Sequence, residues 1–433
     1  MSVGGAAATR APAWLEAGLA LLVIAAPLPF GAVGPGGRTL FEIGALLLTA
    51  AWSLHALWRP TPLPPRPVVA GALGLLALAA LQIVPWPGGR ISVDPGATAS
   101  ALRTGAALVG ILFVATSVVA WRGGTRLGHA LLLSAGFQGL YGVMVVASGH
   151  PFIWGVPKTA YLESATGTFI NRNNYAAFLA ATLPVGAGLL IAAARRVAPR
   201  PGARRSWLIV LGNDGSRALI LGLVAATGLA GLLLSLSRAG TILGLAAIAL
   251  TGAVLLRRRA WPAVAIAALL AALAAIPLLD IGAERLTGRL AASGEELTTA
   301  GGRLSVWHDT IEMAAARPAT GAGFGTFTWA FPRYRSAVVR LHYTHAHEDL
   351  LQLAAEGGLV ALVLLALVLV PLAKVTIASL GGGADPPTRG AALGLCALLL
   401  HALVDFPFHI PAVALVGCVL AGWMFGARWT SAD

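Results

Sequence analysis

Twelve apolar runs, each close to the length of one membrane crossing, dominate this chain. A helix needs about 20 mainly apolar residues to cross the hydrocarbon core of a bilayer. The runs lie near residues 14–33, 39–58, 67–86, 104–121, 128–147, 174–194, 217–236, 239–256, 260–279, 347–373, 388–405 and 409–427. Only 11% of the residues are charged, whereas a soluble domain carries about 25%. The sequence therefore predicts an all-α polytopic membrane protein, a single transmembrane domain over residues 1–433 with about 12 transmembrane helices.

The distribution of basic residues predicts the side of the membrane on which each loop lies. Loops on one side hold 17 Lys and Arg residues, and loops on the other side, a long polar loop left aside, hold 6. Because basic residues are retained in cytoplasmic loops, we expect both termini in the cytoplasm. The net charge of +13 then reflects topology and contact with membrane lipids, and no nucleic-acid partner is expected. The first run, after Arg10, is expected to remain as a signal-anchor helix.

A polar stretch over residues 281–346 separates the ninth and tenth apolar runs, and the orientation places it outside the cell. Within it, residues 303–314 repeat apolar side chains at helical spacing, which predicts a surface helix lying on the bundle. Its apolar face comprises Leu304, Trp307, Ile311 and Ala314. Residues 321–325 predict a turn that lets backbones pack closely, and the aromatic residues after it suit either sugar stacking or an apolar lid. The large loop is therefore expected to contain short helices.

Two arginines on the outer side are candidates for binding an anion. Arg238 lies in the tight turn between the seventh and eighth runs, and Arg303 begins the predicted loop helix. A guanidinium near membrane depth is costly unless it is paired or faces a wet cavity, although a helix-end arginine can also extend its head to the interface. Arginine forks match phosphate oxygens bidentately. The two arginines therefore predict a phosphate-bearing lipid as substrate.

The long loop ends on two histidines, His345 and His347, and Glu348 follows them at the start of the tenth run. The positive end of a helix disfavours a charged imidazole, which suits a general base. Histidines two residues apart point to different faces of a helix, and no third ligand has the spacing of a metal site. We therefore expect no metal and no other cofactor. Acidic residues in a first helical turn also have a simpler role, because they interact favourably with the helix dipole.

Residues 345–361 resemble the signature of the O-antigen ligase and polymerase family. In that signature a histidine is followed directly by Asn, Ser or Gln, and a glycine comes ten residues after that second residue. His347 and Gly358 fit this pattern, whereas Glu348 replaces the expected amide or hydroxyl residue and Ala361 departs from the usual small or aromatic residue. Further segments that resemble the family, in family order, lie at residues 167–173, 237–240, 302–308 and 321–327.

The resemblance implies a GT-C-like glycosyltransferase of the bacterial inner membrane, with its active site in the periplasm. Members take a glycan from an undecaprenyl diphosphate carrier and pass it to an acceptor hydroxyl without a metal. Ligases use a sugar of the lipid A–core as acceptor, and polymerases use another carrier-linked repeat. Carried over to this sequence, Arg238 and Arg303 would hold the diphosphate and stabilise it as the leaving group. His347 would deprotonate or orient the acceptor hydroxyl.

Further residues on the outer face are expected to bind the substrate around these three. They are Asn171, Arg172 and Asn173 at the entry to the sixth run, Trp307 on the loop helix, His345 and Glu348. Asp405 and His409 flank the last outer turn. A ligase acting in lipopolysaccharide or surface polysaccharide assembly is the first hypothesis, and an O-antigen or exopolysaccharide polymerase is the alternative. A transporter of lipid-linked glycan would carry charges through both leaflets and often show repeats, and neither is evident here.

Overall fold

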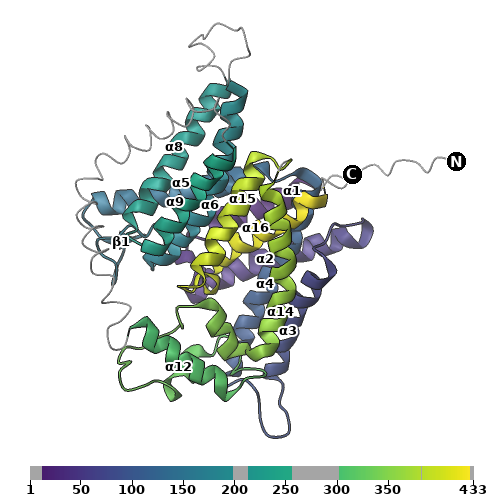
Figure 1. Cartoon of the computed structure of the whole chain (residues 1–433), viewed down its shortest axis with the longest axis vertical. Coiled ribbons are helices and arrows are strands. Elements are labelled where there is room, and N and C mark those ends of the chain that lie inside the picture. The colour runs from purple at the N-terminus through teal and green to yellow at the C-terminus, as the bar shows by residue number, and fades with distance from the viewer. Residues whose placement is uncertain (1–11, 198–212, 256–301, 382, 430–433) are drawn as a thin grey trace, which may run out of the picture.

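The computed structural model describes residues 12–197, 213–255, 302–381 and 383–429. In these ranges the chain is built mainly from helices that pack into one bundle, with a small helical layer at one end (Figure 1). A two-stranded antiparallel sheet joins β1 (Phe152–Ile153) and β2 (Val156–Pro157) in the connection after the fifth helix. The described part of the chain is thus the all-α polytopic membrane protein that the sequence predicts.

Nine helices of the described ranges are long and apolar enough to cross a membrane. They are α2 (Pro35–Trp58), α3 (Arg66–Ile83), α4 (Pro95–Arg122), α5 (Thr125–Ala147), α6 (Arg172–Val197), α8 (Asn213–Leu234), α9 (Arg238–Leu255), α14 (Asp349–Leu380) and α16 (Pro411–Trp429). Two shorter helices, α1 (Ala13–Ala25) and α15 (Pro386–His401), complete the bundle. Eleven of the twelve predicted runs are therefore helices, and the run at 260–279 lies outside the described residues.

The first helix is shorter than its apolar run, which predicted a span to residue 33. α1 ends at Ala25, and the chain then turns through η1 (Phe30–Ala32), where three consecutive residues have positive φ. Pro27 and Pro29 explain the early end, because each lacks an N–H and disfavours helical backbone in the residue before it. A continuous apolar composition therefore hides a backbone break at this point.

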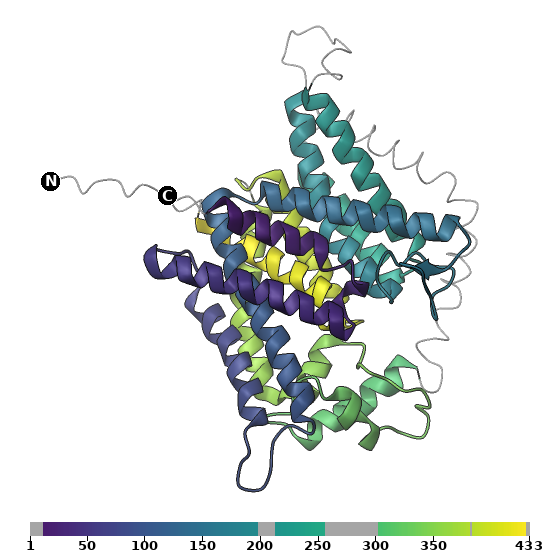
Figure 2. The ribbon, with the colours of Figure 1, turned by 180° about the vertical axis from the view of Figure 1, so that it is seen from behind.

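The helices alternate in direction, so their termini gather at two opposite ends of the bundle. The loop end carries α12 (Arg303–Ala316) and the starts of α4, α6, α9, α14 and α16. The far end carries the C-termini of these five helices and the starts of α3 and α5. Figures 1 and 2, which show opposite sides, both place α12 and its neighbours at the loop end, beside α14 and α3.

Small residues let the central helices approach closely. α16 packs along α4, and α15 packs along α6. A Cβ added at Gly422 would lie 2.6 Å from the Cβ of Ala115 on α4, and Gly390 and Gly394 on α15 face the backbone of α6 equally closely. Close backbone approach through small residues is typical of helix pairs in membranes. The two pairs form the buried centre on which the loop end rests.

The loop helix α12 is present as predicted, but only part of its predicted apolar face is packed: Trp307 and Ala314 are partly buried, whereas the other two residues are not. It buries Val306, Asp309, Thr310 and Met313. Leu304 and Ile311, from the predicted face, are 50% and 57% exposed. The helix therefore has apolar side chains on two faces, one packed on α14 and neighbouring loop segments and one turned away from the protein. After it the loop forms two short helices, α13 (Phe327–Ala330) and η3 (Phe331–Arg333).

The helix α14 is interrupted at Gly358, which has φ of +65° and ψ of −165°. Around the interruption, loop residues 317–323 lie against α14 and bond to its backbone. Leu359 and Val360 donate to the carbonyls of Pro318 and Ala319, and the carbonyls of Ala355 and Glu356 accept from Ala322 and Gly323. Non-helical backbone within a span is tolerated where protein covers it. The loop thus supplies the hydrogen bonds that an unbroken helix would make itself.

Two buried polar side chains fix the turn at residues 321–325 in this position. The carboxylate of Glu356 accepts from the N–H groups of Gly325 and Phe327 at 2.8 and 2.9 Å. The amide of Gln82, on α3, donates to the carbonyls of Thr320 and Glu356 and accepts from the N–H of Phe324. Gln82 is fully buried. The close-packing turn predicted from the glycines is therefore confirmed, with α3 and α14 on its two sides.

The break in α14 predicts that Gly358→Ala destabilises the protein strongly. A residue with a Cβ in this left-handed conformation costs about 1–3 kcal/mol, and the added Cβ would also overlap the backbone of Ala319. We expect a clear fall in the thermal unfolding temperature of the detergent-purified chain. Gly222→Ala is the matched control, because its Cβ would meet only Leu190 at 3.8 Å. Equal unfolding temperatures for the two variants would contradict the proposed constraint at Gly358.

Candidate active site

Acidic and imidazole side chains gather at the loop end, where three segments meet. The segments are the start of α12, residues 345–349 at the start of α14, and residues 402–410 between α15 and α16. A backbone hydrogen bond from Asp349 N to Ala402 O, 2.9 Å long, joins the second and third segments. We call the group of His345, His347, Asp349, Asp405 and His409 the histidine–aspartate cluster.

Asp405 holds the imidazole of His347 in place through a hydrogen bond. Its Nδ1 lies 3.2 Å from Oδ1 of Asp405, which is only 2% exposed in its side chain. The imidazole is 22% exposed and meets the ring of Phe406 edge to face at 4.8 Å between centroids. A buried carboxylate that accepts from Nδ1–H leaves Nε2 as the free acceptor nitrogen. The ring is thus fixed in orientation with one nitrogen available.

Arg303 joins the same carboxylate from the start of α12. Its Nη1 donates to the carbonyl of Val404 at 2.7 Å, and its Nη2 lies 3.8 Å from Oδ2 of Asp405. The guanidinium is 32% exposed. The hydrogen bond to Val404 anchors one nitrogen of the guanidinium. The positive charge of Arg303 therefore lies beside the carboxylate that also holds His347. The sequence assigned Arg303 and His347 to one site, and the structure places both on Asp405.

A second imidazole–carboxylate pair lies behind the first. His409 Nδ1 is 2.7 Å from Oδ1 of Asp349, and the other oxygen of Asp349 accepts from the N–H of Phe408. His345 stacks on Phe406 at 4.3 Å and lies 4.9 Å from the ring of His409. Three imidazoles therefore surround one connection between two helices.

Ion pairing within the cluster stabilises the charged forms of Asp405 and His409. Burial alone would raise the pKa of Asp405, but the hydrogen bond from His347 and the charge of Arg303 outweigh it and hold this pKa below its usual range. Burial would lower the pKa of His409, but the hydrogen bond to Asp349 outweighs it and raises this pKa. Asp405 is therefore an ionised carboxylate at neutral pH, fit to hold an imidazole in one tautomer.

Backbone geometry explains how the chain brings His347 to this place. His347 has φ of +57°, a conformation that is uncommon outside glycine. Glu348 follows as the N-cap of α14, and its side chain accepts from the N–H groups of Leu350 and Leu351. Asn and Ser are typical N-cap residues, which explains why an amide or hydroxyl residue is expected here from the resemblance. Glu348 performs the same capping, and its predicted contact with substrate stays a prediction.

Several polar atoms at the loop end are buried without a hydrogen-bond partner among the described residues. They are Oδ2 of Asp405, Nδ1 of His401, Nε1 of Trp307 and Nε of Arg38. Buried polar groups are nearly always hydrogen-bonded in a complete assembly. Oδ2 of Asp405 lies beside Arg303, so a polar substrate bound there can supply the missing hydrogen bond. Among the residues with such atoms, the sequence had selected only Trp307.

The other predicted residues form a second group at the loop end. Asn171, Arg172 and Asn173 lie at the start of α6, and Arg238 begins α9, which packs along α6. Oδ1 of Asn171 accepts from the N–H of Asn173 at 2.8 Å, and the guanidinium of Arg172 lies over the ring of Tyr161 at 5.1 Å. The structure therefore places these residues on helices different from those of the histidine–aspartate cluster.

The sequence predicted only that Asp405 and His409 flank an outer turn. The structure shows that Asp405 joins His347 to Arg303. Their signal was present, because an acid at the membrane edge of an apolar run is costly and suggests function. Asp349 and Arg38 carried a weaker signal, since each lies in the first turns of its helix. Only the fold shows which histidine each acid meets.

The described ranges contain no group of three or more His, Cys, Asp or Glu side chains arranged to hold a metal ion. The imidazoles and carboxylates of the cluster instead pair two by two, at 3.2 Å for His347 with Asp405 and 2.7 Å for His409 with Asp349. What the arrangement offers chemically is a base held by a carboxylate, with a guanidinium beside it. That set can remove a proton and stabilise an anion.

The fold and the site define a polytopic membrane protein with a polar site at one end of its helical bundle. A model of the O-antigen ligase family matches residues 222–366, which confirms the resemblance drawn from the sequence. The match includes Arg238, Arg303 and His347, and Asp405 lies beyond it. No curated protein matches the chain. The match points to a membrane enzyme of the glycosyltransferase kind, acting on lipid-linked glycans in the membrane.

The surroundings of His345 predict a pH-dependent contribution to stability. Burial, together with the charges of His409 and His347, lowers the pKa of His345 from 6.5 to about 3. Between these values the unfolded chain binds a proton that the folded chain excludes, so the free energy of unfolding falls as pH decreases through this window. His345→Phe keeps a ring for stacking on Phe406 and removes the titration. We expect the unfolding temperature of the parent, relative to this variant, to fall from pH 7.5 to pH 5.

His342→Phe is the control for this comparison, because His342 is exposed in the same loop. The difference in unfolding temperature between His342→Phe and the parent should vary little with pH. A parent-to-variant difference for His345 that stays constant over the same pH range would contradict the assigned environment.

Proposed function

We propose that this protein transfers a glycan from an undecaprenyl diphosphate carrier to an acceptor hydroxyl at the periplasmic face of the bacterial inner membrane. The observation that supports it best is the placement of His347 and Arg303 on the carboxylate of Asp405. Both residues fall within the region matched by the O-antigen ligase family. The loop count, with 17 basic residues on one side and 6 on the other, supports an outward-facing loop end.

In the proposed reaction His347 acts as the general base. Asp405 accepts from Nδ1–H, so Nε2 is the nitrogen that takes the proton of the acceptor hydroxyl. The oxygen of the acceptor then attacks the anomeric carbon of the carrier-linked sugar. A carbon–oxygen bond forms there as the bond from that carbon to the phosphate oxygen breaks. The proton remains on His347, and its charge is balanced by Asp405.

Arg303 stabilises the leaving undecaprenyl diphosphate in this proposal. Its guanidinium is anchored through Nη1 on Val404 and is about one-third exposed, which leaves donors for phosphate oxygens. Charge develops on the diphosphate as the glycosidic bond breaks, and a fixed cation beside it lowers the energy of that state. The chain supplies this charge from its own side chains, so we propose a transferase that requires no metal.

The second group would bind other parts of the lipid-linked substrate. Arg238, at the start of α9, would hold the diphosphate together with Arg303, while Asn171, Arg172 and Asn173 would contact the glycan or the phosphate. The buried indole N–H of Trp307 has no partner among the described residues and is suited to a sugar oxygen. We propose the ligase reaction, with lipid A–core as acceptor. A polymerase, using a second carrier-linked repeat, would employ the same chemistry.

The test uses the purified full chain with carrier-linked oligosaccharide, with and without lipid A–core. We expect glycan on the core from the parent, and a loss of at least about 100-fold in rate for His347→Ala, because general-base catalysis contributes about 10²–10⁴-fold. Arg303→Ala should lose activity comparably, and Arg303→Lys should recover only part of it, since lysine lacks the planar fork. Asp405→Asn should shift the pH–rate profile as well as lower the rate.

His342→Ala and Arg333→Ala are matched controls, because both side chains are exposed in the same loop. They should retain near-parental activity. Each variant is checked for a parental unfolding temperature before its rate is compared. Lengthened carrier-linked glycan in place of labelled core would identify a polymerase. Near-parental transfer by both His347→Ala and Arg303→Ala would overturn the proposed mechanism.

A further inference from the structure

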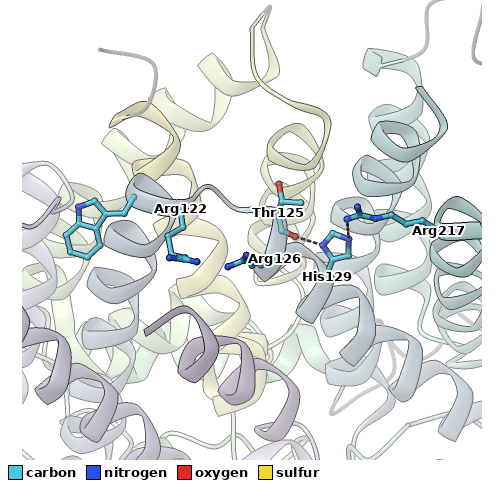
Figure 3. Close-up of a pocket in the computed structure, with 6 residues that line it drawn as sticks. Arg122, Thr125, Arg126, His129 and Arg217 are labelled. Atoms are coloured by element: carbon cyan, nitrogen blue, oxygen red, sulfur yellow. Dashed lines mark hydrogen bonds between the residues drawn. The ribbon is translucent and has the colours of Figure 1, made fainter. Parts of the chain in front are cut away.

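A pocket lies at the far end of the bundle, remote from the histidine–aspartate cluster. Its volume is about 520 Å³. Figure 3 shows its lining, which comes from the end of α4, the start of α5 and the start of α8: Trp121, Arg122, Thr125, Arg126, His129 and Arg217. The helix α4 begins near the loop turn, where Gly325 faces Ala97. A helix of 28 residues is about 40 Å long, so the two sites lie on opposite ends of the molecule.

The pocket carries more positive than negative charge. Three arginines line it, and none of its described lining residues is acidic. The carboxylate of Glu16 contacts two of the arginines, with Oε2 2.6 Å from Nε of Arg122 and 2.9 Å from Nη1 of Arg126. The side chain of Glu16 is only 5% exposed, so its carboxylate is buried against these two arginines. One carboxylate cannot balance the charges of both arginines that it contacts, and among the described residues no ion pair joins Arg217 to an acid. Arg126 is 69% exposed, so its remaining donors are accessible from the pocket.

The third arginine is held in place without being neutralised. Nδ1 of His129 donates to the carbonyl of Thr125 at 2.6 Å, which leaves Nε2 as an acceptor. Nη2 of Arg217 donates to that Nε2 at 3.1 Å, as Figure 3 shows. The imidazole therefore orients the guanidinium and adds no negative charge. The helix α5 begins at Thr125, so the positive end of its dipole adds to the same field.

We propose that this pocket binds a phosphate group, carried either by an anionic lipid headgroup or by a soluble ion. Guanidinium donors that approach from several directions suit a phosphate group, which presents several oxygens to bind them. Leu219 and Ile220 follow Arg217 on α8 and are 56% and 61% exposed. Apolar side chains turned outward beside a cationic pocket are what the acyl chains of a bound lipid would contact. The site is independent of the transfer reaction proposed above.

The test uses the full chain purified in phosphate-free detergent. In one arm, thermal unfolding is followed with sodium phosphate and with sodium chloride at equal ionic strength. In the other, native mass spectrometry measures retention of phosphatidic acid against phosphatidylcholine. We expect the double variant Arg126→Gln with Arg217→Gln to weaken binding by about tenfold or more, because charge-assisted hydrogen bonds are lost. Arg122 is kept, since its removal would strip Glu16 of a buried partner.

Arg66→Gln is the control, because Arg66 is an exposed arginine at the same end of the bundle. It should change binding by less than about twofold. Stabilisation by inorganic phosphate would indicate a soluble ion, and selective retention of phosphatidic acid would indicate a lipid headgroup. If the double variant unfolds, the single variant Arg217→Gln gives the same comparison. The proposal is overturned if neither probe binds above its control. It is also overturned if the arginine variants bind as tightly as the parent.

Discussion

The loop end depends on one constraint, which is that a backbone break inside a membrane helix must have its hydrogen bonds supplied by other parts of the protein. α14 breaks at Gly358, and the loop supplies the missing partners through residues 317–323. The carboxylate of Glu356 then fixes the turn from within the same helix. Because unsatisfied backbone in hydrocarbon costs several kcal/mol per group, loop and helix form one unit. The loop is thereby a rigid wall of the candidate site.

That rigidity explains why side chains so distant in sequence can share one carboxylate. Arg303 begins α12, His347 precedes α14, and Asp405 lies after α15. Backbone hydrogen bonds join these segments, such as the bond from Asp349 N to Ala402 O, which connects the start of α14 to the chain that follows α15. Pairing of buried charges is favourable only when the geometry is set in advance. The electrostatics of the site is thus a consequence of the packing that surrounds it.

Apolar run length was sufficient to predict eleven helices, because the cost of burying polar groups in a membrane is large and local. Run length missed only the early end of the first of these helices, since Pro27 and Pro29 affect the backbone and not the hydropathy. Helical spacing predicted α12 but selected Leu304 and Ile311 for its packed side, and a helix with two apolar faces offers no local signal to choose between them. Motif spacing located Arg303 and His347. Their link through Asp405 required the fold, because it joins segments 58 residues apart across two helices.

The contacts of Gln82 have a consequence for the order in which the protein is made. Its amide is fully buried and bonds to Thr320, Phe324 and Glu356, at separations of up to 274 residues. During synthesis α3 emerges long before any of these partners exist. Its side chain must therefore stay hydrated at the membrane boundary, or find temporary partners, until the ribosome has passed Glu356. The wall of the candidate site can therefore form only after the first turns of α14 have been made, although α3 has been in place since early in synthesis.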